Sequence, residues 1–106
     1  MTSRRVVTTR RADADIHSAV AYYAEVAARD VAGRFVDELR NIRDLLAEHP
    51  AIGSPRFAIE TSIPELRGVA VQGFPYVVIY TDDKDALRIH RVLHTRRDIP
   101  GALTET

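Results

Sequence analysis

Residues 73–93 read GFPYVVIYTDDKDALRIHRVL, and this stretch decides the fold. Its first part, Tyr76–Tyr80, is apolar or aromatic at every position, which is typical of a strand covered on both faces. The polar turn Asp82–Asp85 follows, and Ala86–Leu93 then alternates in polarity as a second strand does. Strands separated by so short a turn pair in antiparallel fashion.

N-terminal to these strands, apolar residues recur at the spacing of an α-helix. Apolar side chains at helical spacing predict a first helix over roughly 11–28, with Thr9 as its N-cap. The same spacing predicts a second helix that opens near Asp30 and ends at His49, because the residue before Pro50 is disfavoured in a helix. Only one or two residues join the two helices, so we expect an antiparallel helical hairpin.

The remaining segments complete a single domain over residues 1–106. Short β-branched or apolar runs predict strands at 4–9 and 66–71, Gly and Pro residues predict a loop over 51–64, and 95–106 reads as a surface tail. The fold class is therefore α+β with the order β-α-α-β-β-β. We expect an antiparallel sheet with the helical hairpin packed on one face and the other face partly open.

Composition limits the classes of function. Formal net charge is zero and cysteine is absent, which argues against strong nonspecific nucleic-acid binding and against thiolate chemistry. The charge is nevertheless segregated, with basic residues in 1–11 and 86–98 and an excess of acids in 12–50. No apolar run is long enough for a signal peptide or a membrane helix, so the sequence predicts a cytoplasmic protein without membrane contact, metal or cofactor.

The last strand carries most of the candidate functional residues. Alternation places Arg88, His90 and His94 on an exposed, basic side, whereas Arg91 points toward the core. Arg91 must therefore pair with a buried acid, or a β-bulge must swing it out. Arg67, on a neighbouring strand, could bind a phosphate or hold an acidic side chain in a salt bridge.

The two histidines of this strand do not suggest a metal site. Four residues of extended chain separate His90 from His94 by about 13 Å, too far to share one ion. His94, followed by Arg96 and Arg97, could act as a general acid or base, or could be a solvated histidine.

Several segments resemble the RelE/ParE family of bacterial toxins in their order and spacing over about residues 4–100. The helical hairpin carries Asp15-Ile16, Tyr22-Tyr23, Phe35 and Leu39, and its end reads His49-Pro50-Ala51-Ile52-Gly53-Ser54-Pro55-Arg56. The C-terminal strands resemble the family in Leu66-Arg67, in Phe74-Pro75-Tyr76-Val77-Val78-Ile79-Tyr80 and in Ile89-His90-Arg91-Val92-Leu93-His94-Thr95-Arg96-Arg97-Asp98.

The resemblance implies a toxin of a type II toxin–antitoxin system, bound in a hetero-oligomer by a cognate antitoxin whose C-terminal segment wraps it. RelE-like members cut mRNA in the ribosome by activating the ribose 2′-hydroxyl. ParE-like members do no chemistry of their own and poison DNA gyrase. The chain is thus an endoribonuclease in the first case and not an enzyme in the second.

The residues favour the ParE-like branch. A RelE-like ribonuclease would use Arg67 and Arg91 as cations and His94 as acid or base, but the open strands lack the lysines usual in that branch, and Thr95 follows His94. We therefore favour no catalytic residue. The candidates for contact with the target or antitoxin are Arg67, Arg88, His90, His94, Arg96 and Arg97. A third hypothesis is that the chain is a non-toxic binding module of the same fold.

Overall fold

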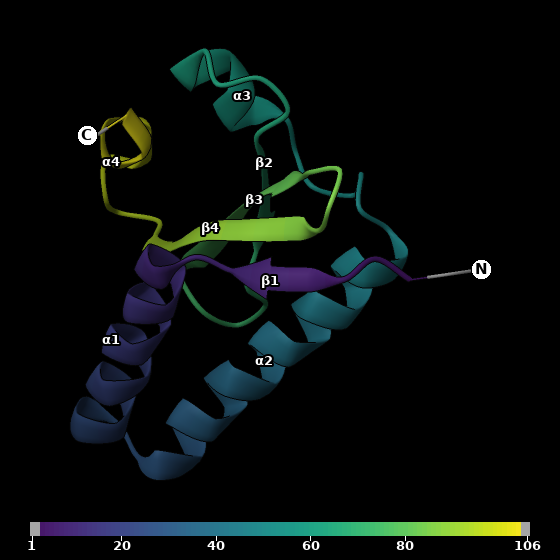
Figure 1. The fold of residues 1–106 in the computed structure, drawn as a ribbon. Coiled ribbons are helices and arrows are strands. Elements are labelled where there is room, and N and C mark those ends of the chain that lie inside the picture. The colour runs from purple at the N-terminus through teal and green to yellow at the C-terminus, as the bar shows by residue number, and fades with distance from the viewer. Residues whose placement is uncertain (1–2, 105–106) are drawn as a thin grey trace.

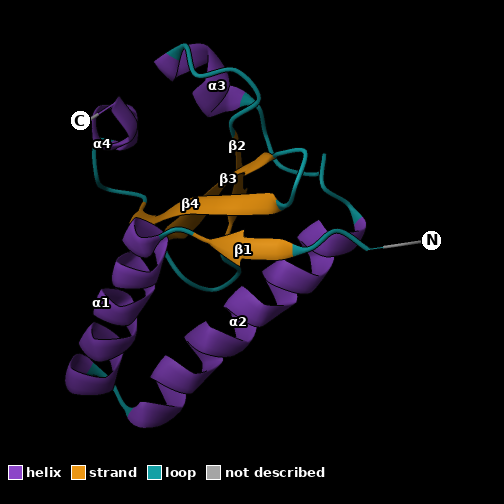
Figure 2. Ribbon diagram, in the orientation of Figure 1, coloured by secondary structure: helices purple, strands orange, loops and turns teal. Residues whose placement is uncertain are grey.

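The two long helices form where the apolar spacing predicts them. In the computed structural model, which describes residues 3–104, α1 spans Arg10–Val26 and α2 spans Arg29–Glu48. The hydroxyl of Thr9 accepts a hydrogen bond from the Ala12 N–H, as expected of an N-cap. Only two residues connect the helices, which form an antiparallel hairpin (Figure 2).

The start of α2 differs from the expectation. Ala28 occupies the cap position and provides no side-chain hydrogen bond, whereas Asp30 lies within the first turn. There its carboxylate suits the positive end of the helix dipole without capping it. At the other end α2 stops at Glu48, two residues before Pro50, as predicted.

The sheet has four strands in the order β1-β4-β3-β2. These are β1 (Val6–Thr8), β2 (Arg67–Ala70), β3 (Tyr76–Asp82) and β4 (Leu87–His94). The last three are antiparallel as predicted, but β1 pairs with β4 in parallel, so the sheet is mixed rather than purely antiparallel. A parallel pair needs a long connection, and here every other element except α4 lies between the two strands.

A second helical layer covers the sheet face that was expected to be partly open. Within the predicted loop 51–64 the chain forms α3, Arg56–Thr61, and within the predicted tail it forms α4, Ile99–Thr104. Residues 105–106 of that tail lie outside the described part of the chain. Figure 1 shows α3 and α4 on one side of the sheet and the hairpin on the other. The surface-tail expectation was wrong for α4, because Ile99 is 7% exposed.

Alternation along β3 divides the buried residues between the two layers. Val78 and Tyr80 pack with the helical hairpin, whereas Val77 and Ile79 pack with α3 and α4. This strand is the most thoroughly buried of the four, as its unbroken apolar sequence predicts. The domain therefore has one sheet with a hydrophobic core on each face.

A β-bulge in β4 changes which residues face which core. Tyr80 pairs with Ile89 and the adjacent Ile79 pairs with Arg91, so His90 is an extra residue in β4. Ile89 and Val92 consequently pack toward the hairpin, although strict alternation would separate them. Beyond the bulge, Leu93 packs toward α3 and α4 instead.

Neither a membrane span nor a metal centre is found in the described residues. No helix within residues 3–104 is long and apolar enough to cross a membrane. The same residues contain no group of three or more histidine, aspartate or glutamate side chains placed to hold a metal ion.

Candidate functional site

Arg91 is tied to a helix carboxylate. Its Nε and Nη2 donate to the two oxygens of Asp15 in α1, at 2.7 and 3.1 Å. The side chains are 8% and 15% exposed, so this bidentate pair is largely shielded from water. Of the two expectations for Arg91, the pairing with a buried acid is the one observed, because the bulge in β4 moves Arg91 to the α3–α4 face but leaves it only 7% exposed.

Asp15 also closes an edge of the sheet. β1 ends at Thr8, opposite Ile89, so the outer edge of β4 has no neighbouring strand beyond that point. There the Thr9 hydroxyl donates to the His90 carbonyl, and the Val92 N–H donates to Asp15 Oδ2. The start of α1 therefore replaces the missing strand, and it holds Arg91 in place at the same time.

Arg67 stabilises the loop that follows α2. Its Nη1 donates to the carbonyl oxygens of Ala51 and Gly53, at 3.1 and 2.8 Å. The Tyr80 hydroxyl contacts the same loop, donating to the Pro50 carbonyl and accepting from the Gly53 N–H. Arg67 and Tyr80 together fix the loop that follows α2, which explains why that stretch is part of a recognisable motif.

Residue 53 must be glycine because a side chain would not fit beside Tyr80, not because of its backbone conformation. A Cβ atom placed there would lie 2.7 Å from the Tyr80 hydroxyl oxygen. That hydroxyl is held by two hydrogen bonds and cannot move away without losing them. The loop backbone can therefore approach Tyr80 only because residue 53 has no side chain.

Arg88 and His90 have partners within the domain. Arg88 forms ion pairs with Asp83 and Asp85 of the β3–β4 turn. The His90 Nε2 lies 2.8 Å from the Thr81 hydroxyl, and the ring is half-buried beneath α4. Burial lowers the pKa of His90, an effect that Asp83 partly offsets and Arg88 reinforces.

His94 and the two arginines after it lie at the end of β4. The His94 ring packs edge-on against Tyr76, with 5.2 Å between ring centroids, and its Nδ1 accepts from the Arg96 N–H. Arg96 and Arg97 are exposed. Of the six contact candidates, these three residues form the most accessible group.

Arg67, Arg91 and His94 do not form a common site. In the sheet register Arg67 pairs with Tyr80 and His94 with Tyr76, four residues apart along β3 or about 13 Å. Arg91 projects from the face that packs against α3 and α4, whereas His94 lies on the hairpin side with Tyr76. The hollow that Arg67 lines contains neither Arg91 nor His94, and the hollow that Arg91 lines contains neither Arg67 nor His94.

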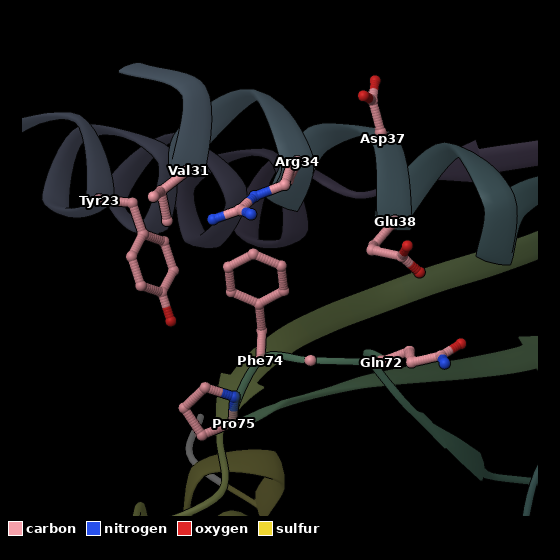
Figure 3. Close-up of a pocket in the computed structure, with 9 residues that line it drawn as sticks. Tyr23, Val31, Arg34, Asp37, Glu38, Gln72, Phe74 and Pro75 are labelled. Carbon is pink, nitrogen blue, oxygen red and sulfur yellow. The ribbon is translucent and has the colours of Figure 1, made fainter. Parts of the chain in front are cut away.

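A hollow of about 640 Å³ lies between α2 and the β2–β3 turn. Figure 3 shows Tyr23 and Phe74 beside it, with Arg34 extending from α2 toward Phe74 and Asp37 pointing away. Burial raises the pKa of Tyr23, with a smaller contribution from Tyr22, so the phenol is protonated at neutral pH. The lining combines the apolar side chains of Val31, Phe74 and Pro75 with the charged ones of Arg34, Asp37 and Glu38.

Sequence reasoning did not locate a second, apolar groove between the hairpin and β1. It holds about 200 Å³, has Val78 and Val92 in its floor, and has Val36 and Leu39 of α2 in one wall. Arg40 and Arg43 stand at the rim of that wall and are exposed. The signal in the sequence was the apolar stripe of α2, in which Val36 and Leu39 remain only partly buried.

Comparison with known proteins agrees with the fold and with the family resemblance. A family model described as "ParE toxin of type II toxin-antitoxin system, parDE" matches residues 6–99. A solved structure described as "Chromosomal ParDE TA system from P. aeruginosa" is similar with a TM-score of 0.72 and 17% identity, covering 87% of this chain and 96% of that one. At this identity the likeness shows a shared fold. A search of curated proteins gives no match.

Proposed function

Because this chain belongs to the ParE toxin family of type II toxin–antitoxin systems, we propose that it inhibits DNA gyrase by binding, and that a cognate antitoxin silences it in the cytoplasm. Among toxins of this superfamily the alternative activity is ribosome-dependent cleavage of mRNA. That reaction needs a base, a cation and an acid around one phosphate.

The observation that carries the proposal is the pairing of Arg91 with Asp15. A guanidinium held by a carboxylate on two of its nitrogens is poorly placed to stabilise a phosphorane, since its charge is already compensated. Arg67 is similarly engaged with loop carbonyls. Two of the three candidate catalytic residues thus maintain the fold, which favours an inhibitor that acts by contact.

We assign contact with the target to His94, Arg96 and Arg97. His94 ends the last strand and the two arginines follow it; both arginines are exposed, and their charge differs from that of the acidic hairpin. A gyrase poison needs a surface of this kind rather than a reactive group. His94→Gln should therefore retain toxicity, whereas a double Arg96→Glu, Arg97→Glu variant should lose it.

The first experiment is pulse-labelling of DNA and protein synthesis in a bacterial host during the minutes after induction of the full chain. We expect DNA synthesis to fall first, with cleaved DNA accumulating on gyrase. An earlier fall in protein synthesis would replace the proposal with mRNA cleavage. The matched control for the double variant is Arg29→Glu, a charge reversal at an exposed position far along the chain in α2.

We further propose that the apolar groove beside β1 receives an antitoxin segment with apolar residues flanked by acidic ones. The groove floor offers apolar contacts, and at the rim Arg40 and Arg43, which form exposed ion pairs with Asp37 and Asp44, can exchange these weakly held partners for a segment that carries acidic residues. An acidic, amphipathic segment is complementary to both features, and it would cover partly exposed apolar surface that the toxin otherwise leaves in water.

A pair of matched variants tests this assignment. Leu39→Glu places a charge in the groove wall and should weaken binding of the antitoxin by about tenfold or more, a loss of ~1.4 kcal/mol. Ile59→Glu introduces the same change at a site that is 81% exposed on α3 and should leave binding unchanged. Equal affinity of both variants for the antitoxin would place its binding site elsewhere.

A further inference from the structure

The hollow that Arg91 lines lies beneath α4 and holds about 330 Å³. Its polar wall comes from the start of α1, the two central strands and the turn between them, and consists of Arg11, Thr81, Asp83, His90 and Arg91. Its apolar wall comes from the residues before β2 and from α4, and consists of Ile63, Leu66, Ala102 and Leu103. His90 therefore shares the hollow with apolar side chains of the last helix.

The charges on the polar wall are already matched. The groups that face His90 form two ion pairs with one further cation, namely Arg88 with Asp83, Arg91 with Asp15, and Arg11. The carboxylate that lines the hollow is thus engaged with an arginine. A proton added to His90 therefore places an extra positive charge in a partly buried site whose charges are balanced without it.

The hydrogen bond to Thr81 shows where that proton would go. A hydrogen bond from the Thr81 side chain is the largest influence that lowers the pKa of Asp83. A hydroxyl has one proton, so when Thr81 donates to Asp83 it accepts from His90 Nε2 at 2.8 Å. Further protonation takes place at Nδ1, and the new N–H needs an acceptor that water can supply.

The helix α4 is the part of the wall that can move away. It has six residues, lies beside α3 and is joined to β4 by residues 95–98 (Figure 1). Ile99, Ala102 and Leu103 pack it onto the sheet by apolar contact. The N–H groups of Gly101 and Ala102 bond to Asp98, directly before the helix, so these bonds move with it. Short terminal elements of this kind open at lower free energy than central strands do.

We propose that protonation of His90 releases α4 from the sheet, so that this helix is a proton-sensitive lid on the hollow beneath it. While the lid is closed the ring is half-buried, and when it opens water reaches the ring. Burial accordingly lowers the pKa of His90 in the closed state, an effect that Asp83 opposes and Arg88 reinforces. The open state then binds the proton more readily, so a fall in pH below the ordinary histidine pKa of about 6.5 favours opening.

The lid adjoins the residues that we assign to target contact. Arg96 and Arg97 belong to the segment that connects β4 to α4. Release of α4 removes one of the two anchors of this segment, and ordering it again on a target costs free energy. Acidification should therefore weaken contact with the target. This consequence rests on the proposed function, whereas the release of α4 does not.

Hydrogen exchange of the full chain at about pH 7.5 and about pH 5.5 measures the opening. Protection factors, which correct for the intrinsic pH dependence of exchange, are compared for Ala102 in α4 and Val78 in the central strand β3. We expect Ala102 to be the less protected of the two and to lose protection at the lower pH by up to about tenfold, the limit set by one pH unit below 6.5. Equal protection of the two amides, or no change at Ala102, would overturn the proposal.

His90→Gln and His94→Gln form the matched pair of variants. His94 also lies close to α4 along the chain, and its Nδ1 accepts from the Arg96 N–H. Glutamine does not titrate, so in His90→Gln the protection of Ala102 should be the same at both pH values. His94→Gln should keep the wild-type response. A response that persists in His90→Gln, or that disappears only in His94→Gln, would overturn the proposal.

A reciprocal measurement does not depend on the folding of His90→Gln. If proton uptake opens the lid, then a weaker lid must favour proton uptake. Leu103→Ala removes part of the apolar cover and should raise the pKa of His90, as followed by NMR titration of its ring. Ile59→Ala, at the 81% exposed position on α3, should leave the titration unchanged. An unchanged titration in Leu103→Ala would overturn the proposal. Neither experiment involves gyrase, so failure of either leaves the proposed function standing.

Discussion

Asp15 and Arg91, 76 positions apart in the sequence, form a bidentate ion pair that joins the first helix to the last strand. The same carboxylate accepts the Val92 N–H. One acidic side chain therefore satisfies three donors at the place where the sheet has lost its neighbouring strand, and the contact both closes an edge and fixes the position of α1.

Removing this carboxylate charge should destabilise the protein strongly. In Asp15→Asn the buried guanidinium loses its counter-charge, and breaking such a pair costs about 3 kcal/mol. Urea unfolding measures the loss. Asp37→Asn is the control, because Asp37 is 69% exposed in its ion pair with Arg40 and should change stability by less than about 1 kcal/mol. Similar losses in both variants would contradict a special role for Asp15.

The loop after α2 should loosen when the Tyr80 hydroxyl is removed. Tyr80→Phe leaves the buried Gly53 N–H without its acceptor, at a cost of about 1–3 kcal/mol. Hydrogen exchange at Gly53 should accelerate together with the fall in stability. Tyr22→Phe removes a hydroxyl from a side chain that is 56% exposed and should have no effect on either quantity. Unchanged exchange at Gly53 in Tyr80→Phe would refute this account of the loop.

The second helical layer should contribute measurably to stability. Ile99→Ala removes a side chain that packs in the core beneath α3 and α4, and such truncations cost about 2–5 kcal/mol. Ile59→Ala makes the same change at an exposed position and should stay within about 0.5 kcal/mol of wild type. If Ile99→Ala unfolds at the same urea concentration as Ile59→Ala, α4 is a surface appendage after all.

Stability should fall in weakly acidic buffer because of His90. Burial lowers the pKa of this ring in the folded state, so the unfolded chain binds the proton more readily. The contribution of His90 is complete above the unfolded pKa of about 6.5 and is lost as pH falls toward the lower folded pKa. His90→Gln should show a smaller loss of unfolding free energy than wild type between about pH 7.5 and about pH 5.5. Parallel curves would contradict it.

Periodicity in the sequence was sufficient to predict the long elements. Both helices of the hairpin and the three C-terminal strands were predicted close to their observed bounds, because each has a repeating apolar pattern over several residues. α3 has six residues and buries only Phe57, which leaves no repeat to detect among the glycines and prolines around it. α4 is equally short, and its burial depends on α3 being present.

The candidate site was less predictable because it depends on contacts between distant segments. The sequence predicted that Arg91 points toward the core and pairs with an acidic side chain there. It could not identify Asp15 as that partner, because many acidic residues lie on the first two helices. It offered phosphate or an acidic side chain as partners of Arg67, whereas the observed partners are carbonyl oxygens. Every residue has a backbone carbonyl, so the sequence cannot indicate which of them will accept a hydrogen bond from Arg67.

The extra residue in β4 has an evolutionary consequence. Up to Ile89 the odd-numbered residues of β4 face the hairpin, whereas beyond the bulge the even-numbered residues do. A pattern of apolar substitutions that is tolerated in one half of the strand is therefore not tolerated in the other. Deleting His90 would remove the bulge and leave Ile89 opposite Tyr80 and Arg91 opposite Ile79, so both residues would keep the faces they now occupy. A one-residue deletion is therefore better tolerated at His90 than elsewhere in β4, where it would exchange the two faces of the strand, and relatives whose last strand differs in length should differ here.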